Sequence, residues 1–574
     1  MSPEQLTLNP PVITADELTG PPRLRVRGLS VAFIRNGHHR TVVEDVSFDL
    51  PAGQCVAIVG ESGSGKSVTA RTLVGLTGRN SVVAADELLL DGQDISRLTA
   101  RAWRSIRGRR VGFILQDALV SLDPLRPVGH EISEALALHR WGTRASRKQR
   151  VLELLDVVGV PDAARRARQR PGELSGGLRQ RALIASAIAL DPDIVIADEP
   201  TTALDVSVQA QVLTQLEQMK QRGVSLILIS HDLSVVAHLA DHILVMKAGR
   251  VLEQGPARTV LSEPSHEYTR RLIAAVPGQH TRGHRLAPET SAVPHDHHTS
   301  SLTVLATDGP VLEASGLVKR FPSPGGTPQL AVDQVSFQLF RGQTLGIVGE
   351  SGSGKSTTAR LALALERADA GTVTLLGQPW SVIPETARRA LRRRIAVVYQ
   401  DPLSSFDPRW TTERILLDAL TGTEYRTAAE RSTRVRELLD AVGLDEDLLD
   451  RFPLRMSGGQ RQRIAIARAL AASPEVIVLD EAVSALDVSV QAQVLDLLVA
   501  LQQRLGVSYL FISHDLGVIS HMSDQVLVMK DGVIVERGTP TEIFTRPQHP
   551  YTRQLVSALP TLDDRDSTIR TWRS

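Results

Sequence analysis

The chain has 574 residues, more than one hydrophobic core usually organises, so two or more domains are expected. Hydrophobic residues make up 42% of the chain and charged residues 22%, which is the balance of a globular protein. The formal net charge of +1 excludes a strong overall attraction to nucleic acid or to acidic lipid.

Residues 1–22 form an N-terminal tail that contains acidic residues and prolines, and we expect it to be disordered rather than a signal peptide. No stretch of the chain reaches the roughly 18 consecutive apolar residues that cross a bilayer. The single cysteine, Cys55, excludes an internal disulfide and favours a reducing, cytoplasmic compartment. If the protein acts at a membrane, other chains must provide the spanning part.

In residues 23–277, short apolar runs rich in β-branched residues alternate with amphipathic stretches. Nearly continuous hydrophobicity predicts strands that are buried on both faces of a sheet. Residues 182–190 and 208–220 have the pattern of helices. The alternation predicts an α/β fold with helices packed on a mainly parallel sheet. Strands are predicted at 55–60, 111–115, 193–198, 225–230 and 242–247.

The segment GESGSGKSVTA, residues 60–70, has P-loop (Walker A) spacing and stands between a predicted strand and a predicted helix. Its glycines allow backbone N–H groups to surround phosphate oxygens, and the helix start adds partial positive charge. We expect Lys66 to reach the β- and γ-phosphates and Ser67 to bind Mg²⁺; an ordinary glycine turn is the alternative. The nucleotide-binding residues predicted here are Gly60, Ser62, Gly63, Gly65, Lys66, Ser67 and Val68.

Two acidic residues, Asp198 and Glu199, follow the apolar run IVIA. A buried strand that ends in carboxylates places them at the carboxyl edge of the sheet, where α/β folds bind ligands. We expect Asp198 to hold Mg²⁺ and Glu199 to orient or deprotonate the attacking water. A plain polar strand terminus is the alternative.

Residues 278–310 are rich in Gly, Pro, Ser, Thr and His and predict a flexible linker. Residues 311–560 then repeat the motifs of the first half in the same order, 282 to 289 residues later, and residues 561–574 form a C-terminal tail. Asp480 is the second predicted Mg²⁺ ligand and Glu481 the second water-activating residue. The second phosphate loop predicts nucleotide binding by Gly349, Ser351, Gly352, Gly354, Lys355, Ser356 and Thr357, with Ser356 also on Mg²⁺.

The segments LSGGLRQR and MSGGQRQR, together with the phosphate loops, acid pairs and ISHD segments, resemble the ATPase subunits of ABC transporters. The resemblance implies two tandem P-loop ATPase domains, each with a mainly parallel core sheet, a helical subdomain and an antiparallel β subdomain. It implies that a serine-capped helix of one half contacts ATP held by the other, because a helix start binds anions. The residues concerned are Ser175, Gly176 and Gly177 opposite Lys355, and Ser457, Gly458 and Gly459 opposite Lys66.

The same resemblance assigns further residues around each nucleotide. Gln116 and Gln400 match the glutamine that contacts nucleotide and Mg²⁺ and reports to the membrane subunits, and His231 and His514 match a catalytic histidine near the γ-phosphate. A packed or exposed histidine is the alternative. Two further pairs are Asp205 with Asp487, at the domain interface, and Phe33 with Phe321, which stack on adenine or belong to a strand core. Both sites therefore look hydrolytic.

The segments PSHEYTRRL, residues 264–272, and PQHPYTRQL, residues 547–555, are similar to the C-terminal region of oligopeptide, dipeptide and nickel importer ATPases. The resemblance implies an Mg²⁺-dependent ATPase that energises peptide import from the cytoplasmic face of the membrane. The implied partners are two polytopic permease subunits and an extracytoplasmic binding protein, with no nucleic acid. The cysteines that hold an iron–sulfur cluster in some members are missing here, so no cluster is expected.

Several alternatives stay open at this stage. A soluble tandem ATPase acting on ribosomes also lacks membrane spans, whereas a DNA-repair ATPase would require long coiled-coil or zinc-cysteine insertions that this sequence lacks. Glutathione, opines or nickel complexes are alternative cargoes. The arginine clusters at 101–110 and 387–394 either contact RNA or form exposed helix faces. The linker histidines bind a metal or are simply solvated: His280, His284, His295, His297 and His298.

Overall fold

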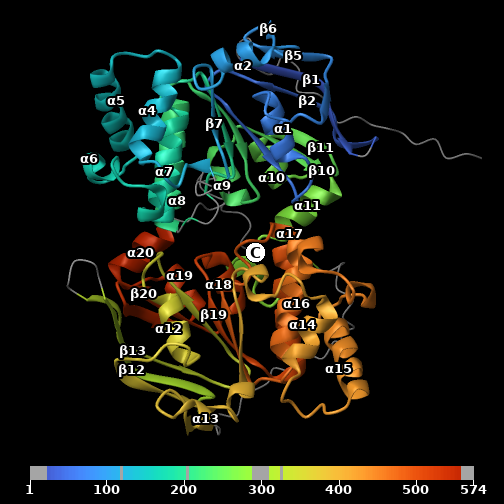
Figure 1. The fold of residues 1–574 in the computed structure, drawn as a ribbon, viewed down its shortest axis with the longest axis vertical. Helices are drawn as coiled ribbons and strands as arrows, with labels where there is room; N and C mark the ends of the chain where they lie inside the picture. The colour runs from blue at the N-terminus through green and yellow to red at the C-terminus, as the bar shows by residue number, and fades with distance from the viewer. Residues whose placement is uncertain are drawn as a thin grey trace, which may run out of the picture. The chain divides into compact units, whose positions relative to one another are not determined.

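A computed structural model describes residues 22–35, 37–116, 121–201, 204, 206–287, 309–322 and 328–557. The described residues divide into two compact units, one up to residue 273 and one from residue 274 onward (Figure 1). Each unit contains one phosphate loop, one acid pair and one HxYT segment. The duplicated organisation read from the sequence is therefore present in the fold.

The first unit is built around a six-stranded sheet in the order β11-β10-β3-β9-β8-β7. All neighbours are parallel except β10 and β11, which form an antiparallel pair. Three of these strands are buried at every position, as continuous hydrophobicity predicts. The five predicted strands are confirmed, and the full set is β3 (Cys55–Val59), β7 (Val111–Ile114), β8 (Ile194–Asp198), β9 (Ser225–Ile229), β10 (His242–Lys247) and β11 (Arg250–Pro256).

A second, antiparallel sheet has the order β2-β1-β5-β6, with β4 also paired to β1. Apolar residues of both sheets and of helix α1 (Lys66–Leu73) form one buried core cluster. The helix that begins at the phosphate loop is therefore fixed between two sheets. The strands of the second sheet are β1 (Leu24–Arg35), β2 (His38–Leu50), β4 (Ser81–Ala84), β5 (Glu87–Leu90) and β6 (Gln93–Asp94).

Helices α4 to α7 form a separate layer at one side of the first unit (Figure 1). Helix α7 begins at the N-cap Ser175, and α4 and α5 pack against it. The helices predicted at 182–190 and 208–220 are confirmed as parts of α7 and α8. The remaining bounds are α2 (Ala100–Ile106), α4 (Val128–Leu138), α5 (Arg144–Val157), α6 (Ala163–Arg166), α7 (Gly176–Ala187), α8 (Val206–Gln221), α9 (Leu233–Leu239), α10 (Ala257–Ser262) and α11 (Glu267–Ala274).

The second unit repeats this arrangement with a six-stranded sheet in the order β17-β18-β19-β14-β20-β21 and an antiparallel sheet in the order β13-β12-β15-β16. The first sheet contains β14 (Thr344–Val348), β17 (Ile395–Val398), β18 (Val476–Asp480), β19 (Ser508–Ile512), β20 (Gln525–Lys530) and β21 (Val533–Gly538). The second contains β12 (Leu312–Phe321), β13 (Gln329–Leu339), β15 (Ala370–Leu375) and β16 (Gln378–Pro379). The fold class is therefore as predicted in both halves.

The helices of the second unit follow the order of the first. Helix α17 has the N-cap Asp487 and ends at Gly506, whose φ of +66° suits a left-handed helix terminus. The bounds are α12 (Lys355–Ala362), α13 (Glu385–Arg388), α14 (Thr412–Ala419), α15 (Ala428–Ala441), α16 (Gly458–Leu470), α17 (Val488–Leu505), α18 (Leu516–Met522), α19 (Pro540–Thr545) and α20 (Pro550–Ser557). Among the described residues, none of the helices has the length and apolar character of a membrane span.

The start of the predicted linker differs from the expectation. Residues 278–287 contain a 3-10 helix, η3 (Gln279–Thr281), and belong to the second unit. Leu286 is only 2% exposed, because it packs on this unit rather than standing in solvent. Composition alone suggested a flexible segment, since Gly, Thr and His dominate it, but specific polar contacts hold its first ten residues. Residues 288–308 lie outside the described part of the chain, as do the tails at 1–21 and 558–574.

Candidate nucleotide sites

The first phosphate loop connects β3 to α1 and is shaped by glycine conformations that other residues rarely adopt. Gly60 has a φ of +145°, and a Cβ there would lie 2.1 Å from the carbonyl oxygen of Met246. Gly65 has a φ of +102° at the N-cap of α1. Lys66 is 6% exposed, and its Nζ donates to the carbonyl oxygens of Gly60 at 2.6 Å and Glu61 at 2.8 Å. The lysine thus closes the loop that precedes its own helix.

The second phosphate loop has the same geometry between β14 and α12. Gly349 has a φ of +151°, and a Cβ there would lie 2.2 Å from the carbonyl oxygen of Met529. The Nζ of Lys355 donates to the carbonyl oxygens of Gly349 and Glu350, both at 2.7 Å. Each loop therefore presents a helix start and a buried cation beside one hollow of backbone amides, the arrangement that binds polyphosphate.

The carboxylates at the ends of β8 and β18 lie beside the loop serines. Ser67 Oγ donates to Asp198 Oδ1 at 2.9 Å, and Ser356 Oγ donates to Asp480 Oδ1 at 3.3 Å. The Oδ2 of Asp198 is buried and has no hydrogen-bond partner within the described chain. Burial and the neighbouring Glu199 raise the pKa of Asp198, although the Ser67 hydrogen bond opposes the shift. A hydroxyl and a carboxylate with an unused buried oxygen are the donor set that Mg²⁺ prefers, so these residues fit the ion.

The next residue in each unit is a glutamate whose backbone is left-handed, with φ of +50° at Glu199 and +51° at Glu481. Such a conformation is unfavourable for glutamate and is often found where function requires it. His231 Nδ1 lies 3.4 Å from Glu199 Oε1, and His514 Nδ1 lies 3.5 Å from Glu481 Oε1. The structure thus brings each predicted histidine to its predicted glutamate.

The pKa values of the two histidines shift in the same direction. Burial lowers the pKa of His231 and of His514, but the hydrogen bond and charge of the paired glutamate outweigh it, so both pKa values lie above their ordinary value. Burial raises the pKa of Glu481, but the hydrogen bond and charge of His514 outweigh it, so the net shift is downward. In the second unit both partners therefore favour a protonated imidazole against an ionised carboxylate, and in the first unit the shift of His231 has the same direction as that of His514.

The two predicted Q-loop glutamines differ in their contacts. Gln116 Nε2 donates to Glu199 Oε2 at 2.8 Å. Gln400 Nε2 instead donates to Ser484 Oγ at 3.4 Å. In the part of the chain that the structure describes, the first glutamine therefore contacts the glutamate of its own unit and the second does not.

The signature segments cap helices α7 and α16, as their serines predict. Ser175 Oγ accepts from the backbone N–H of Leu178 at 3.4 Å, and Ser457 Oγ accepts from that of Gln460 at 3.2 Å. The side chain of Gln460 in turn accepts from the backbone N–H of Ser457, which completes a capping box. Leu178, at the same position in the first unit, has no side-chain acceptor for such a bond.

The second signature glycine also has a packing role that sequence reasoning missed. A Cβ at Gly177 would lie 2.7 Å from Val208 Cγ1, and a Cβ at Gly459 would lie 2.4 Å from Val490 Cγ1. Each of these valines stands on the helix that follows the acid pair. The glycine therefore lets the signature helix approach that neighbouring helix closely.

The predicted interface aspartates and adenine-stacking aromatics have varied surroundings. Asp205 lies outside the described residues, and Asp487 accepts from the backbone N–H of Val490 as the N-cap of α17. Phe33 is partly buried against the core of the first unit. Phe321 is 36% exposed, with Lys319 Nζ 5.3 Å from its ring centroid. The structure therefore leaves both aromatic assignments as predictions.

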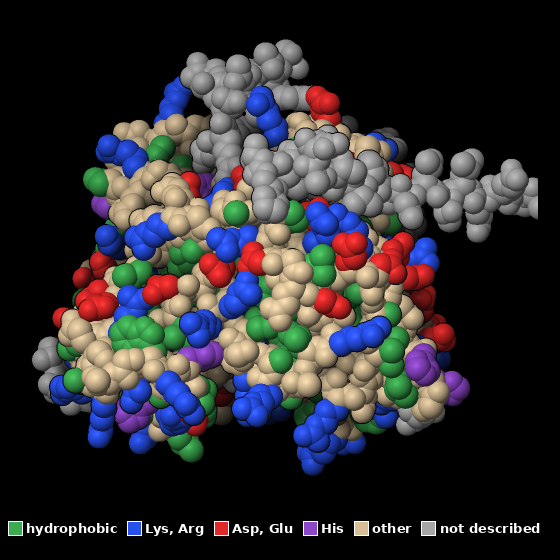
Figure 2. Space-filling model, turned by 90° about the horizontal axis from the view of Figure 1, so that it is seen from above, with side chains coloured by type: hydrophobic (Ala, Val, Ile, Leu, Met, Phe, Trp, Pro, Cys, Tyr) green, Lys and Arg blue, Asp and Glu red, His purple; other side chains and the backbone are tan. Residues whose placement is uncertain are grey.

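The arginine clusters have internal partners. Arg107 donates to the carbonyl oxygens of Val74 and Gly75 and lies over Trp103, whereas Arg101 and Arg104 are exposed. In the second unit, Arg388 and Arg392 bond carbonyls and lie over Trp380, whose Nε1 donates to Ala362 O at the end of α12. These arginines hold the end of the phosphate-loop helix. Figure 2 shows basic side chains interspersed with acidic ones over the face it displays.

Comparison with known proteins gives the class first. The sequence matches the ABC transporter family at residues 43–202 and 332–484, more than half of the chain. The chain is therefore an ABC ATPase with two cassettes, coupled to transport. A structure of the cassette MJ0796 bound to ADP and Pi is similar to part of it, with 27% identity over 40% of this chain and 98% of that one and a TM-score of 0.37.

The particular group follows from the C-terminal segment of each half. Residues 252–301 and 535–574 match the oligopeptide/dipeptide transporter C-terminal region, so the chain belongs to that group of ABC ATPases. It is 42% identical to a glutathione import ATP-binding protein of Pectobacterium atrosepticum, over 94% of this chain and 90% of the relative. It is 43% identical to a peptidoglycan transport ATP-binding protein of Agrobacterium fabrum, over 94% and 96%.

Proposed function

We propose that the chain energises the import of peptide-like solutes and that its two ATP sites form between the two halves. The observation that carries the proposal is the duplication of a full set of ATPase groups, each unit also offering a serine-capped helix start. A helix start with unsatisfied N–H groups binds anions, and within each unit the phosphate loop already provides one such start. The second start supports a role on the nucleotide held by the other half.

In the proposed reaction, Lys66 leaves its own loop carbonyls and donates to the β- and γ-phosphates of ATP. Ser67 and Asp198 would hold Mg²⁺, which neutralises phosphate charge when bound. Glu199 accepts a hydrogen bond from the attacking water and orients it toward the γ-phosphate. His231, protonated beside Glu199, donates toward the developing negative charge. In the second half, Lys355, Ser356, Asp480, Glu481 and His514 take the same roles.

The cargo class rests on the relatives. One is named for glutathione import and one for peptidoglycan transport, and both cargoes contain short peptide chains. We propose a short peptide or a peptide-containing conjugate as the cargo. The partners in the proposal are two polytopic permease subunits and an extracytoplasmic binding protein, and the site of action is the cytoplasmic face of the membrane. Copurification of permease subunits with the tagged chain tests the partners; ribosomes in their place would contradict them.

The catalytic roles are tested by the double variant Glu199→Gln with Glu481→Gln. We expect it to bind ATP but to lose at least about 100-fold in turnover, since the water loses its base. Glu263→Gln with Glu446→Gln, two exposed sites away from the loops, is the matched control. Wild-type turnover in the double variant would contradict the roles of the glutamates.

The composite arrangement is tested separately by Ser457→Arg, whose long side chain would obstruct the nucleotide of the other half. We expect photo-crosslinking of 8-azido-ATP to fall at the loop of Lys66 and to persist at the loop of Lys355. Peptide mapping after crosslinking distinguishes the two loops. Equal loss at both loops, or loss at Lys355 alone, would contradict the pairing.

A further inference from the structure

The HxYT segment reaches the phosphate loop in both units. Tyr268 of α11 accepts a hydrogen bond at its hydroxyl from the backbone N–H of Glu61, at 3.2 Å. Tyr551 of α20 accepts in the same way from the N–H of Glu350, at 3.1 Å. The two tyrosines are 6% and 4% exposed. The same contact therefore recurs in both units, between segments some 200 residues apart in the sequence.

The tyrosine is held in place from the sheet. Glu253 of β11 accepts from the backbone N–H groups of Ser265 and His266, at 2.7 and 3.1 Å. His266 Nδ1 then accepts from the N–H of Tyr268 at 3.0 Å, and Lys247 Nζ lies 4.5 Å from the tyrosine ring centroid. The second unit repeats these contacts with Glu536, Gln548, His549, Tyr551 and Lys530.

We propose that Tyr268 and Tyr551 are positioning residues for the phosphate loops. Residue 61 is held at both ends, its N–H by Tyr268 and its carbonyl by Lys66. When Lys66 turns to phosphate, it releases the carbonyl, and the tyrosine hydroxyl remains as a fixed point at the start of the loop. The tyrosine thus keeps the amide hollow in its binding shape, which lowers the cost of binding nucleotide.

The test removes one oxygen atom from each site. Tyr268→Phe and Tyr551→Phe keep the ring and its contact with lysine but delete the acceptor. Because one hydrogen bond contributes modestly, we expect the KM for ATP to rise roughly 3- to 10-fold with kcat changed less than about twofold. Mapped 8-azido-ATP labelling should weaken in the altered half only.

Tyr509→Phe is the matched control, because it also deletes a buried tyrosine hydroxyl, which donates to Leu498 O at 2.9 Å away from the loop. We expect this control to lower thermal stability without raising the KM. An unchanged KM in Tyr268→Phe and Tyr551→Phe, or an equal rise in Tyr509→Phe, would overturn the positioning role.

A second, independent observation concerns residues 277–287, here called the strap. Asp496 of α17 is 8% exposed and accepts from the backbone N–H groups of Leu286 and Ala287, at 3.0 and 2.8 Å. Thr281 Oγ1 lies 3.0 Å from His521 Nδ1 of α18, and Arg282 pairs with Asp524 at 3.0 Å. Each carboxylate oxygen of Asp496 accepts one backbone N–H of the strap. These bonds matter for stability, because a buried carboxylate without partners would be costly.

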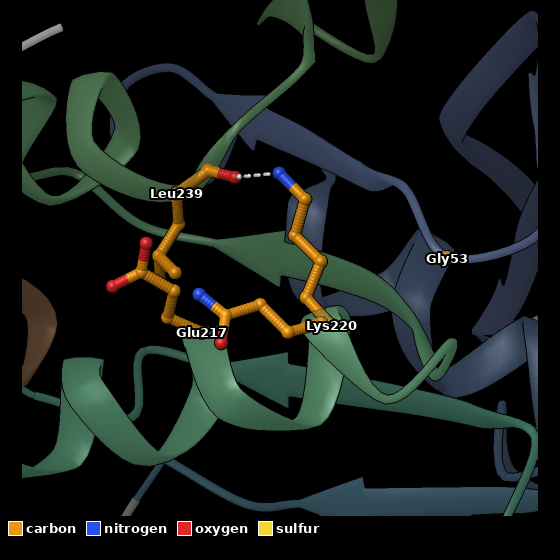
Figure 3. A pocket seen from close by; sticks show the side chains of 5 residues that line it. Gly53, Glu217, Lys220 and Leu239 are labelled. Carbon is orange, nitrogen blue, oxygen red and sulfur yellow. Dashed lines mark hydrogen bonds between the residues drawn. The ribbon is translucent and has the colours of Figure 1, made fainter.

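The corresponding face of the first unit lacks these features. In the aligned sequences, Thr214 stands in place of Asp496, and it is exposed. Asp241, the counterpart of Asp524, pairs with Lys220 of its own unit at 2.7 Å. Figure 3 shows the pocket at this face, where Lys220 donates to the carbonyl of Leu239 beside Glu217. The first unit thus satisfies internally a carboxylate that the second unit satisfies with the strap.

Gly517 gives a third difference between the two faces. A Cβ there would lie 2.5 Å from Pro277 O, and its counterpart in the first unit is Ser234. Only a glycine therefore allows the strap to lie this close to α18.

We infer that the face formed by α17 and α18 is a dedicated docking site for the strap. Ala287 and Gly309, the described residues on either side of 288–308, both belong to the second unit. The boundary between the two units lies between residues 273 and 274, just before the strap begins. A cut within residues 288–308 should consequently leave the halves associated through the strap.

The experiment introduces a tobacco etch virus protease site at residues 293–299 of the full chain. After cleavage in nucleotide-free buffer with EDTA, we expect the two fragments to co-elute in size-exclusion chromatography. Asp496→Ala should separate them, and excess synthetic peptide of residues 276–288 should separate the wild-type fragments. Thr214→Ala is the matched control and should leave them together. Separation of the wild-type fragments without peptide, or co-elution with both Asp496→Ala and peptide, would overturn the docking site.

Discussion

The two halves agree closely at the phosphate loops and the glutamate–histidine pairs, and they differ at the face that contacts the strap in the second unit. Both phosphate loops and both glutamate–histidine pairs have nearly the same distances, and the loop serine donates to the aspartate in both halves, at 2.9 and 3.3 Å. The faces formed by α8 with α9 and by α17 with α18 carry different residues at Thr214 and Asp496. The comparison teaches that the ATPase geometry depends on strand ends shared by both copies, whereas the strap contacts depend on a few residues that the second unit alone carries, such as Asp496 and Gly517.

Among the variants that compare the two halves, Gly60→Ala and Gly349→Ala should have the largest effect, and it should be equal in the two halves. Each added Cβ would lie within 2.2 Å of a carbonyl oxygen on a backbone that favours glycine. We expect each variant to lose at least about tenfold in ATP affinity at its own loop, with about 2–4 kcal/mol lost from unfolding. Mapped 8-azido-ATP labelling and thermal unfolding measure both effects. A large effect in only one half would break the equivalence of the loops.

Exchanging one residue between the two halves should have the next largest effect, and its size should differ between them. Gly517→Ser copies the first unit into the second and would place a Cβ 2.5 Å from Pro277 O, so we expect about 1–3 kcal/mol of destabilisation. Ser234→Gly makes the opposite change and should cost about 1 kcal/mol or less, through helix propensity alone. Urea unfolding of the full chain measures both. Equal costs would show that the strap does not depend on Gly517.

The glutamines should give a smaller, one-sided effect. Gln116 holds Glu199 through one hydrogen bond, whereas Gln400 contacts Ser484. We expect Gln116→Ala to change the steady-state turnover of the purified chain about two- to fivefold, and Gln400→Ala to change it less. Equal changes in the two variants would show that the difference between the two contacts has no consequence for turnover, and a larger change in Gln400→Ala would contradict the prediction.

The smallest expected effect is a pH dependence of stability that arises from His521, which contacts Thr281 of the strap. Burial lowers the pKa of His521, although Asp496 and the backbone of Thr281 oppose the shift and Arg282 and His280 add to it. Because the folded pKa lies below the unfolded value of about 6.5, the second unit should be fully stabilised above that pH and lose stability as the pH falls below it. We expect a loss of about 1 kcal/mol or less.

His521→Gln should flatten this dependence in urea unfolding between pH 8 and 5.5. His238→Gln, the change at the partly exposed counterpart in the first unit, is the control. A steeper dependence in His521→Gln would contradict the assignment.

Much of the fold could be predicted because strands with continuous hydrophobicity, such as 225–230, are buried on both faces. The acid pairs followed from the same signal, since they stand directly after such strands. The Tyr268 contact could not be predicted, because a hydrogen bond to a backbone amide leaves no pattern in spacing. The strap was missed for a related reason: its composition is that of a loop, and its partner Asp496 resembles a surface residue of an amphipathic helix.

The tryptophans packed at the ends of the two phosphate-loop helices offer a natural optical readout. Trp380 is fully buried beside α12, and Trp103 lies close to Gly75 at the end of α1. The chain contains only five tryptophans, so emission from these two forms a large share of its intrinsic signal. Nucleotide-dependent shifts in their emission would let each cassette be followed in real time, without an attached dye.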